Sequence, residues 1–207
     1  MTYRILRLIA YIITKLTARL EFVGQDNIPD EPPYLLTTNH LSAFDLPSLL
    51  WVLPHTIRAF AASKHRSNPL YAPILEAAQT IWVRRGEVDR QALREALAVL
   101  ERGEVLGVSP EGTRANESHA LQEAKAGAAY LATRADVPIV PVGIVGTEKI
   151  KHNLLRLRRT KVRIVVGQPF RLPESGQVRN RKLQEYTDLI MRRIAELLPE
   201  EYRGVYA

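Results

Sequence analysis

A histidine and an aspartate stand five residues apart in the segment TTNHLSAFD, where they are His40 and Asp45. The segment follows an apolar, strand-like stretch at residues 34–38 and precedes the apolar, helix-like sequence LPSLLWVL. Ligands of α/β proteins bind beyond the carboxyl ends of strands, and an imidazole there can accept a proton from a hydroxyl near neutral pH. We therefore expect His40 to act as a general base, with Asp45 folded back to orient the ring and stabilise the imidazolium.

The same residues also have a purely structural interpretation. The segment from Ser42 to Asp45 matches a helix capping box, in which Ser42 caps the helix and Asp45 bonds back from the third helical position. The residues alone leave both interpretations of Asp45 open.

A second group of polar residues lies in VLGVSPEGTRA, where an apolar strand runs into a Pro-Glu-Gly turn. The turn brings Glu111, Thr113 and Arg114 into one short exposed loop. Arg114 can bind a phosphate through two donors, Thr113 can donate to it, and Glu111 can accept from a hydroxyl or hold Arg114. These residue types suit a phosphorylated polyol, and an ordinary surface turn with an ion pair would have the same sequence.

Two further apolar strands end in cations. The segment AASK ends with Lys64, and TIWVRR ends with Arg84 and Arg85. One such cation is more often solvated than bound to a ligand, so the prediction of an anion-binding pocket rests on their repeated placement after strands. The other histidines have none of the close spacings of a metal site, so no metal is expected.

Short β-rich segments alternate with helical ones along the chain and would position these groups. Strands are predicted at residues 20–23, 34–38, 57–62, 80–84, 105–109, 139–145 and 162–167. Helices are predicted at residues 88–102, 121–135 and 180–198. This alternation predicts a single α/β domain over residues 21–207, with a mostly parallel or mixed sheet of about seven strands flanked by helices.

Residues 2–20 are predicted to form a basic amphipathic helix, and residues 1–20 a membrane-interface segment. At about 100° per residue, one face holds the apolar side chains Ile5, Ile9, Ile12, Ile13, Leu16 and Leu20. The opposite face holds Arg4, Arg7, Tyr11, Thr14 and Lys15. The apolar face can pack on the protein's own core or bind a membrane surface. Its longest uncharged run, residues 8–14, is far shorter than the ~20 residues that span a bilayer.

Composition narrows the possible chemistry further. The 207 residues include no cysteine, which excludes disulfides, thiolate zinc sites and a cysteine acyl-enzyme. Lysine and arginine total 29 against 22 acidic residues, giving a net charge of +7. This charge suits an anionic partner such as a phospholipid, a phosphorylated substrate or a nucleic acid.

Four segments, NHLSAFD, IWVRR, SPEGTR and VPIVPV, resemble in order and separation the four blocks of the glycerolipid acyltransferases, above all their bacterial 1-acyl-sn-glycerol-3-phosphate acyltransferase branch. The resemblance covers about residues 34–167. It implies that His40 is the catalytic base and Asp45 its partner. It also implies an acceptor-phosphate site made of Lys64, Arg85, Glu111, Gly112, Thr113 and Arg114. The implied fold is that of the glycerol-3-phosphate acyltransferases.

The reaction implied by this resemblance moves a fatty acyl group from acyl-coenzyme A or acyl carrier protein to the sn-2 hydroxyl of lysophosphatidic acid. The product, phosphatidic acid, belongs to phospholipid biosynthesis, and no cofactor is needed. The enzyme is expected to be monotopic on the cytoplasmic face of the cell membrane, because charges interrupt the apolar run that a secretory signal would need. Its first helix would bind one leaflet, with Arg4, Arg7, Lys15 and Arg19 at anionic headgroups.

Two departures from the family's pattern leave the acceptor open. Ser109 replaces an aromatic residue usual before Pro-Glu-Gly, and Arg84 replaces an acidic residue usual before the second-block arginine. Another lysophospholipid or lipid acceptor is therefore the alternative. A noncatalytic binder of anionic lipid or nucleic acid, suggested by LLRLRR at residues 154–159, would leave His40 and Asp45 without a role, so no nucleic acid partner is expected.

Overall fold

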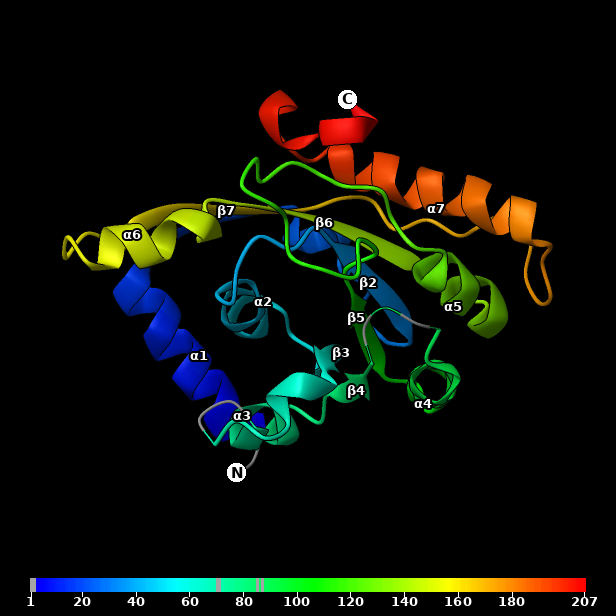
Figure 1. Ribbon diagram of the computed structural model, residues 1–207, viewed down its shortest axis with the longest axis horizontal. Helices are drawn as coiled ribbons and strands as arrows, with labels where there is room; N and C mark the ends of the chain where they lie inside the picture. The colour runs from blue at the N-terminus through cyan, green and yellow to red at the C-terminus, as the bar shows by residue number, and fades with distance from the viewer. Residues whose placement is uncertain (1–2, 70–71, 85, 87) are drawn as a thin grey trace.

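The computed structural model describes residues 3–69, 72–84, 86 and 88–207, and its centre is a mixed sheet (Figure 1). Across the sheet, the strands lie in the order β1 (Ala18–Val23), β7 (Thr160–Val166), β6 (Ile139–Val145), β2 (Tyr34–Thr38), β5 (Val105–Val108), β3 (Ile57–Ala62) and β4 (Ile81–Val83). Strands β6 and β7 pair antiparallel, and the other neighbours pair parallel. The prediction of a seven-stranded α/β fold is confirmed.

The antiparallel pair divides the sheet into two directions. Strands β6, β2, β5, β3 and β4 run one way, and β7 and β1 run the other. The edge at which the first group ends is therefore also the edge at which β1 and β7 begin. We call it the carboxyl edge, and it receives every loop that follows the five parallel strands.

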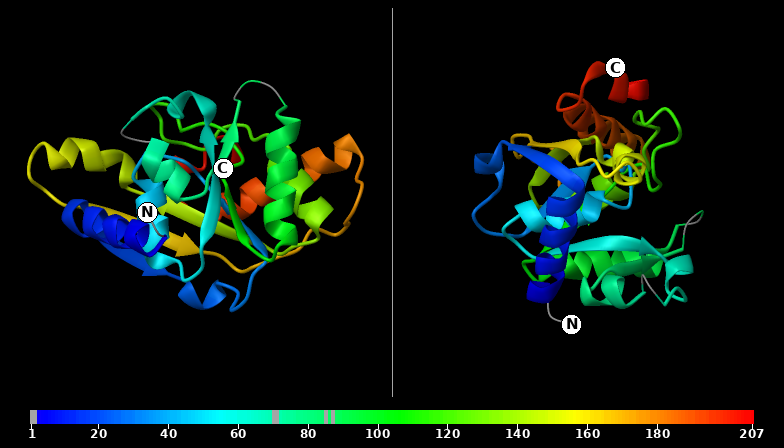
Figure 2. Two further views of the ribbon diagram at one scale, coloured as in Figure 1. Left: turned by 90° about the horizontal axis from the view of Figure 1, so that it is seen from below. Right: turned by 90° about the vertical axis from the view of Figure 1, so that its left-hand side faces the viewer.

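Helices cover both faces of the sheet. They are α1 (Tyr3–Thr17), α2 (Asp45–Val52), α3 (Ala72–Ala77), α4 (Arg90–Glu101), α5 (Gly127–Ala135), α6 (Ile150–Leu154) and α7 (Asn180–Ala195). Short 3-10 turns are η1 (Gln25–Asn27), η2 (Ser63–His65), η3 (Thr147–Lys149), η4 (Glu200–Tyr202) and η5 (Gly204–Tyr206). One core packs α4, α5 and α7 against the sheet, and another packs α2 and α6 (Figure 2).

Strand β2 shows how the sequence builds this layered core. Leu35 belongs to the core under α4, α5 and α7, whereas Tyr34 and Leu36 belong to the core on the other face. Successive side chains of a strand point to opposite faces, so a central strand with a helix layer on each side is apolar at every core position. All five residues of β2 are buried accordingly.

Predicted strand boundaries lie within two residues of the observed ones, but the three predicted helices of the domain are all shorter than predicted. The helix predicted at residues 88–102 spans Arg90–Glu101, the helix predicted from residue 121 begins at Gly127, and the helix predicted to reach residue 198 ends at Ala195. Before Gly127, backbone amides bond outside any helix: Leu121 donates to the Tyr202 carbonyl at 2.9 Å, and Lys125 donates to the Pro110 carbonyl at 2.9 Å. These loop contacts replace the first turns of the predicted helix.

The first helix also differs from the prediction. It ends at Thr17 instead of residue 20, because Ala18 already pairs with Thr160 in the sheet. Thr14, predicted on the face opposite the apolar one, is buried, as are Leu6 and Ala10. The charged residues of α1 are also not all fully exposed, since Arg7 contacts α2.

Arg7 caps the carboxyl end of α2 and does not face outward. Its Nε donates to the Leu50 carbonyl at 3.1 Å, and its terminal nitrogens donate to the carbonyls of Trp51 and Pro54 at 3.4 and 3.3 Å. The last carbonyls of a helix lack partners within the helix, and a cation also complements the dipole there. Arg7 therefore has a structural role that the prediction of a headgroup contact did not include.

Candidate active site

The imidazole of His40 and the carboxylate of Asp45 are in direct contact. His40 Nδ1 lies 2.7 Å from Asp45 Oδ2. His40 follows β2, and Asp45 is the first residue of α2, with only 3% of its surface exposed. An ionised carboxylate only accepts hydrogen bonds, so Nδ1 carries the hydrogen and Nε2 keeps a lone pair. The pair has the geometry of a base with its orienting partner.

Asp45 also organises the turn that carries His40. The backbone amides of Leu41 and Ser42 donate to Asp45 Oδ2 at 2.8 and 2.9 Å. Ser42 Oγ accepts from the amide of Phe44 at 3.1 Å, and α2 begins at Asp45 with Phe44 before it, so Ser42 does not cap the helix as predicted. Only the bond back from Asp45 to the Ser42 amide is observed, and Asp45 makes it with the same oxygen that contacts His40.

Thr147, which the sequence analysis did not select, binds the other carboxylate oxygen. Its hydroxyl donates to Asp45 Oδ1, and the residue is fully buried. Thr147 follows Gly146, whose φ of 97° is in the left-handed region. A Cβ at Gly146 would lie 2.2 Å from the Lys161 carbonyl oxygen, so the turn that delivers Thr147 requires glycine. The sequence did contain one signal for Thr147, namely a polar residue directly after a glycine at the end of a predicted strand.

Asn39 joins the ends of β2 and β6 beside this pair. Its side-chain amide donates to the Ile144 carbonyl at 2.8 Å, and its side-chain oxygen accepts from the Ile144 amide at 2.8 Å. Asn39 is 2% exposed. Two reciprocal bonds in a buried position hold the segments bearing His40 and Thr147 in register.

Glu111 connects the loop after β5 to the loop after β2. Its carboxylate accepts from the backbone amides of His40 at 3.4 Å and Gln122 at 3.0 Å. Burial raises the pKa of Glu111, and these two hydrogen bonds oppose that rise. Both carboxylate oxygens have main-chain partners, so the observed role of Glu111 is to fix the loop, not to hold Arg114 as the sequence suggested.

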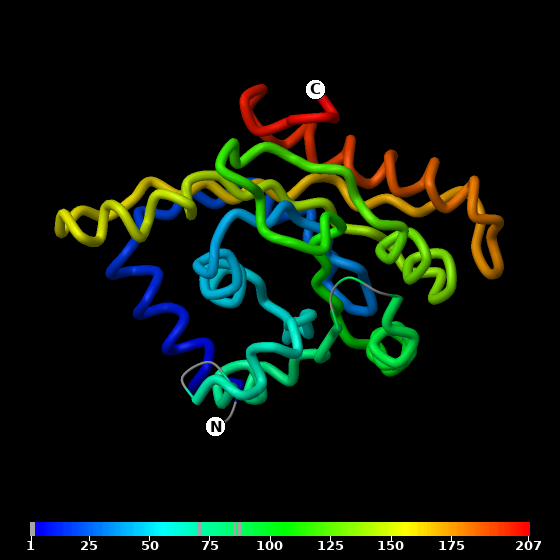
Figure 3. The backbone as a smooth tube through the Cα atoms, viewed as in Figure 1, coloured from blue at the N-terminus to red at the C-terminus, as the bar shows by residue number. Residues whose placement is uncertain are grey.

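The loop with Thr113 and Arg114 lies directly against the backbone of His40. Beyond the contact of Glu111 with the His40 amide, the amide of Ala115 donates to the His40 carbonyl at 2.7 Å. Figure 3 shows the green segment after β5 passing beside the loop between β2 and α2. The side chains of Thr113 and Arg114 are exposed. They are therefore available to a ligand next to the imidazole.

A lysine that the sequence analysis missed covers the glycine of this loop. Gly112 has a φ of 70°, and a Cβ added to it would lie 3.4 Å from Lys125 Cδ and 3.7 Å from Lys125 Nζ. The backbone amide of Lys125 is bonded to the Pro110 carbonyl. Lys125 falls in a segment predicted as helix, so nothing in the sequence pattern indicated its approach to the turn.

The cations after β3 and β4 extend the same edge. Lys64 is exposed in η2. Strand β5 lies between β2 and β3, which puts the ends of those two strands about 10 Å apart at ordinary strand spacing. Arg84 Nε lies 3.6 Å from Asp89 Oδ2, and Asp89 caps α4. Arg85, the other predicted phosphate ligand, lies outside the described residues.

A known family accounts for this arrangement. The family model described as acyltransferase matches residues 19–145, which include the histidine, the aspartate and the loop after β5. The chain belongs to the acyltransferase family. A 1-acyl-sn-glycerol-3-phosphate acyltransferase of Bacillus subtilis is 23% identical over 188 residues, 90% of this chain and 92% of that protein.

Two other proteins resemble this acyltransferase over much of its length. The lyso-ornithine lipid O-acyltransferase of Pseudomonas aeruginosa is 32% identical over 140 residues, 67% of this chain and 53% of that protein. The crystal structure of a 1-acyl-sn-glycerophosphate acyltransferase, PlsC, from Thermotoga maritima is 25% identical. It superposes with a TM-score of 0.71 and covers 94% of this chain and 79% of its own. The acyltransferase fold and the enzyme class expected from the sequence are confirmed.

Proposed function

We propose that this acyltransferase esterifies the free sn-2 hydroxyl of lysophosphatidic acid to form phosphatidic acid, with His40 as the general base. One observation carries the proposal. The imidazole of His40 contacts buried Asp45, and the backbone amide and carbonyl of His40 are bonded to the loop that bears Thr113 and Arg114. A base for a hydroxyl thus lies next to hydrogen-bond donors for a phosphate. That combination suits an acceptor whose hydroxyl and phosphate are a short distance apart.

The reaction follows from the lone pair on His40 Nε2. Nε2 takes the hydroxyl proton as the acceptor oxygen attacks the carbonyl carbon of an acyl thioester. Asp45 stabilises the resulting imidazolium. The tetrahedral intermediate then forms the ester by breaking the carbon–sulfur bond, and the departing thiolate recovers the proton from His40. The acceptor oxygen attacks the thioester itself in this mechanism, so no acyl-enzyme is required, and the absence of cysteine excludes a cysteine acyl-enzyme.

Proton transfer of this kind contributes about 10²–10⁴-fold to the rate, so much of the acceleration must come from positioning the two substrates. Arg114 and Thr113 would bind the acceptor phosphate, with Lys125 over the same turn and Lys64 further along the edge. Arg85 stays in this proposed site on the basis of the family's pattern. The net charge of +7 attracts either donor, acyl-coenzyme A or acyl carrier protein.

The outer face of α1 supports a peripheral location on a membrane surface, and we propose the cytoplasmic side of the cell membrane. Ile5, Leu8, Ile12 and Leu16 on this face are 46–68% exposed. Tyr11 and Trp51 form an edge-to-face pair at 5.3 Å, and Lys15 lies over both rings, as interfacial aromatic and basic residues often do. No helix within the described ranges is long and apolar enough to cross a bilayer.

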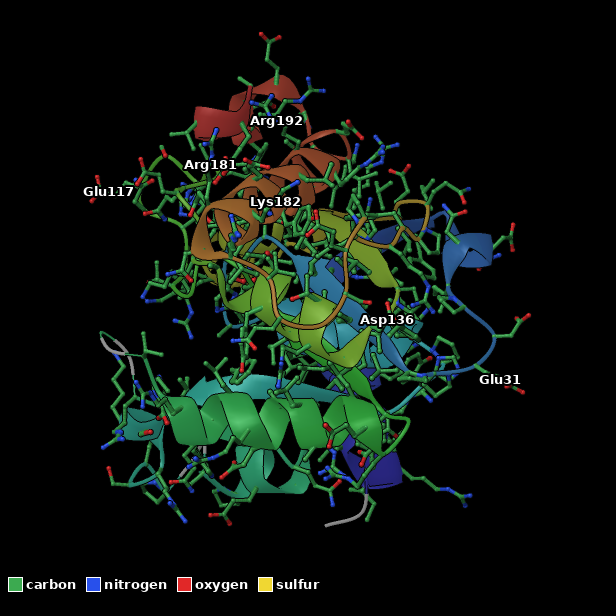
Figure 4. All side chains as sticks on the ribbon, turned by 90° about the vertical axis from the view of Figure 1, so that its right-hand side faces the viewer. Glu31, Glu117, Asp136, Arg181, Lys182 and Arg192 are labelled. Atoms are coloured by element: carbon green, nitrogen blue, oxygen red, sulfur yellow. The ribbon has the colours of Figure 1, made fainter. Side chains whose placement is uncertain are left out.

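The opposite side of the molecule has a different surface. Figure 4 shows charged side chains of both signs projecting there, including Arg181, Lys182 and Arg192 of α7 together with Glu117 and Asp136. Such a mixed charged surface suits water. This difference between sides supports binding through α1 and not through α7.

A lyso-ornithine lipid is the second candidate acceptor, because one relative is named for it. The Pseudomonas aeruginosa protein acts on a lyso-ornithine lipid according to its name. That lipid class lacks the phosphate for which we propose Arg114, so the two acceptors separate cleanly in an assay.

The test is transfer of a radiolabelled acyl group from acyl-coenzyme A, and in parallel from acyl carrier protein, in detergent micelles. Lysophosphatidic acid is the acceptor in one arm and a lyso-ornithine lipid in the other. Wild type is compared with His40→Ala and with His152→Ala, an exposed histidine on α6 that serves as the matched control. We expect product from wild type and His152→Ala and at least about a 10²-fold loss in His40→Ala. Equal rates would remove His40 as the base. Product only with lyso-ornithine lipid would replace the proposed acceptor.

A further inference from the structure

The turn after α6 exposes leucines that the fold does not use. Leu155 is 82% exposed and Leu157 is 95% exposed, whereas Ile150 at the start of α6 is 1% exposed and lies in the core. Leu157 has a φ of 53°, a left-handed backbone that a bulky residue seldom adopts. We call residues 154–158 the leucine tip.

The tip is a defined turn. The amide of Leu157 donates to the Leu154 carbonyl at 3.0 Å, and the amides of Arg156 and Arg158 donate to the Asn153 carbonyl at 3.0 and 2.9 Å. These bonds hold the backbone while both leucine side chains point away from the core. A held backbone with an outward apolar pair indicates a binding surface.

The charges around the tip identify its partner. Residues 151–163 contain only basic charges, namely Lys151, Arg156, Arg158, Arg159, Lys161 and Arg163. Exposed leucines between arginines are the composition of segments that enter the interface of a bilayer with anionic lipids. A nucleic acid would use the arginines and leave the leucines in water.

The tip is also continuous with the outer face of α1. Arg159 Nε donates to the Ala18 carbonyl at 3.0 Å, and Thr160 pairs with Ala18 at the start of the two strands. Leu16, which is 68% exposed, precedes Ala18 by two residues. In the right-hand view of Figure 2, α1 and the segment of α6 both face the viewer.

The tip is linked along the chain to the catalytic pair as well. It follows η3, whose first residue, Thr147, binds Asp45. The short helix α6 lies between η3 and the tip. The reversed direction of β7 and β1 brings both the tip and the end of α1 to the carboxyl edge.

We propose that the leucine tip is a second membrane-inserting element, which enters the same leaflet as α1. Leu155 and Leu157 reach the acyl region, and Arg156 and Arg158 contact anionic headgroups. This inference rests on the proposed action on a membrane lipid. Two adjoining attachment points at the β1–β7 end of the carboxyl edge restrict the orientation of this edge towards the bilayer, whereas a single helix could rotate about its own axis.

The test is sedimentation of the full chain with vesicles of phosphatidylcholine, with and without phosphatidylglycerol. We expect the double variant Leu155→Ser, Leu157→Ser to bind both kinds of vesicle about tenfold or more weakly than wild type. Arg156→Gln, Arg158→Gln should lose affinity only for the anionic vesicles, by about tenfold. Val205→Ser is the matched control, because Val205 is 65% exposed in η5 and should leave binding unchanged.

Activity separates failure of the tip from failure of the proposed reaction. Turnover of lysophosphatidic acid in detergent micelles should be equal in wild type and the double leucine variant, and on vesicles it should fall in the variant. Unchanged vesicle binding by the double variant overturns the role of the tip, as does a variant whose only change is its oligomeric state. If the wild type is inactive, only the proposed reaction is contradicted. The role of the tip is still decided by vesicle binding in the sedimentation experiment.

Discussion

The loops after β2 and β5 both bring charged residues to the carboxyl edge, but they hold them in opposite ways. After β2, the carboxylate of Asp45 is buried and accepts four hydrogen bonds. After β5, buried Glu111 fixes the loop while Thr113 and Arg114 stay exposed. Proton transfer needs a base oriented before the substrate arrives, whereas phosphate binding needs accessible donors. In the proposed mechanism, the loop after β2 therefore orients the base and the loop after β5 binds the acceptor phosphate.

Asp45→Asn tests the fixed loop and should have the largest effect. An amide cannot accept bonds on both sides, so the imidazole would lose its correct tautomer and kcat should fall about 10³–10⁴-fold. The measurement is turnover at saturating acceptor and donor, with circular dichroism to confirm that the variant folds. A folded variant with nearly normal turnover would show that Asp45 serves only the helix start.

Arg114→Ala tests the exposed loop. We expect KM for lysophosphatidic acid to rise about 10²-fold with little change in kcat, because a charged hydrogen-bonding partner of the phosphate is lost. Lysine at this position should restore only part of the affinity. Arg134→Ala, an exposed arginine of α5, is the control. A fall in kcat with unchanged KM would show that Arg114 orients a reacting group instead of binding the phosphate. The two loops would then not differ in role.

Thr147→Val asks how much orientation depends on the second carboxylate oxygen. The substitution keeps the volume but removes the donor to Asp45 Oδ1. We expect kcat to fall about tenfold at unchanged KM, and the free energy of unfolding to fall by about 1–3 kcal/mol, because a buried acceptor loses its partner. Thr147→Ser keeps the hydroxyl and should retain most of the rate. A rate equal to wild type in the valine variant would show that Thr147 does not position Asp45.

Glu111→Gln sharpens the comparison through pH and should have the smallest effect. Burial raises the pKa of Glu111 in the folded protein, which favours the neutral carboxyl there. The stability this contributes is present below the ordinary value of about 4.3 and is lost as pH rises through the raised value. The unfolding free energy of wild type relative to the variant should therefore fall with rising pH. Urea unfolding at several pH values measures it, and a difference independent of pH would contradict the prediction.

The sequence predicted the features that depend on neighbouring residues. The spacing of His40 and Asp45 and the turn at Glu111 are local, and the alternation of strands and helices follows from hydrophobic pattern. Contacts between distant segments carry no such signal. Thr147 meets Asp45 across 102 residues, and Asn39 meets Ile144 across 105.

Residue class also misled the prediction in α1. Arg7 and Thr14 were grouped with the other polar residues on the face opposite the apolar one, yet Thr14 is buried and Arg7 bonds the carbonyls at the end of α2. A helical wheel gives the angle of each side chain but not the neighbour that it meets. Carbonyls without partners at the end of another helix became visible only when α1 and α2 were seen together.

The contact of Arg7 with α2 also fixes how far the imidazole of His40 lies from α1. Arg7 holds one end of α2, and Asp45 begins the other, eight residues or about 12 Å away. If α1 lies on the bilayer as proposed, α2 sets the height of the imidazole above the acyl chains. The enzyme would then select acceptors by how far their hydroxyl stands above the membrane as well as by their phosphate.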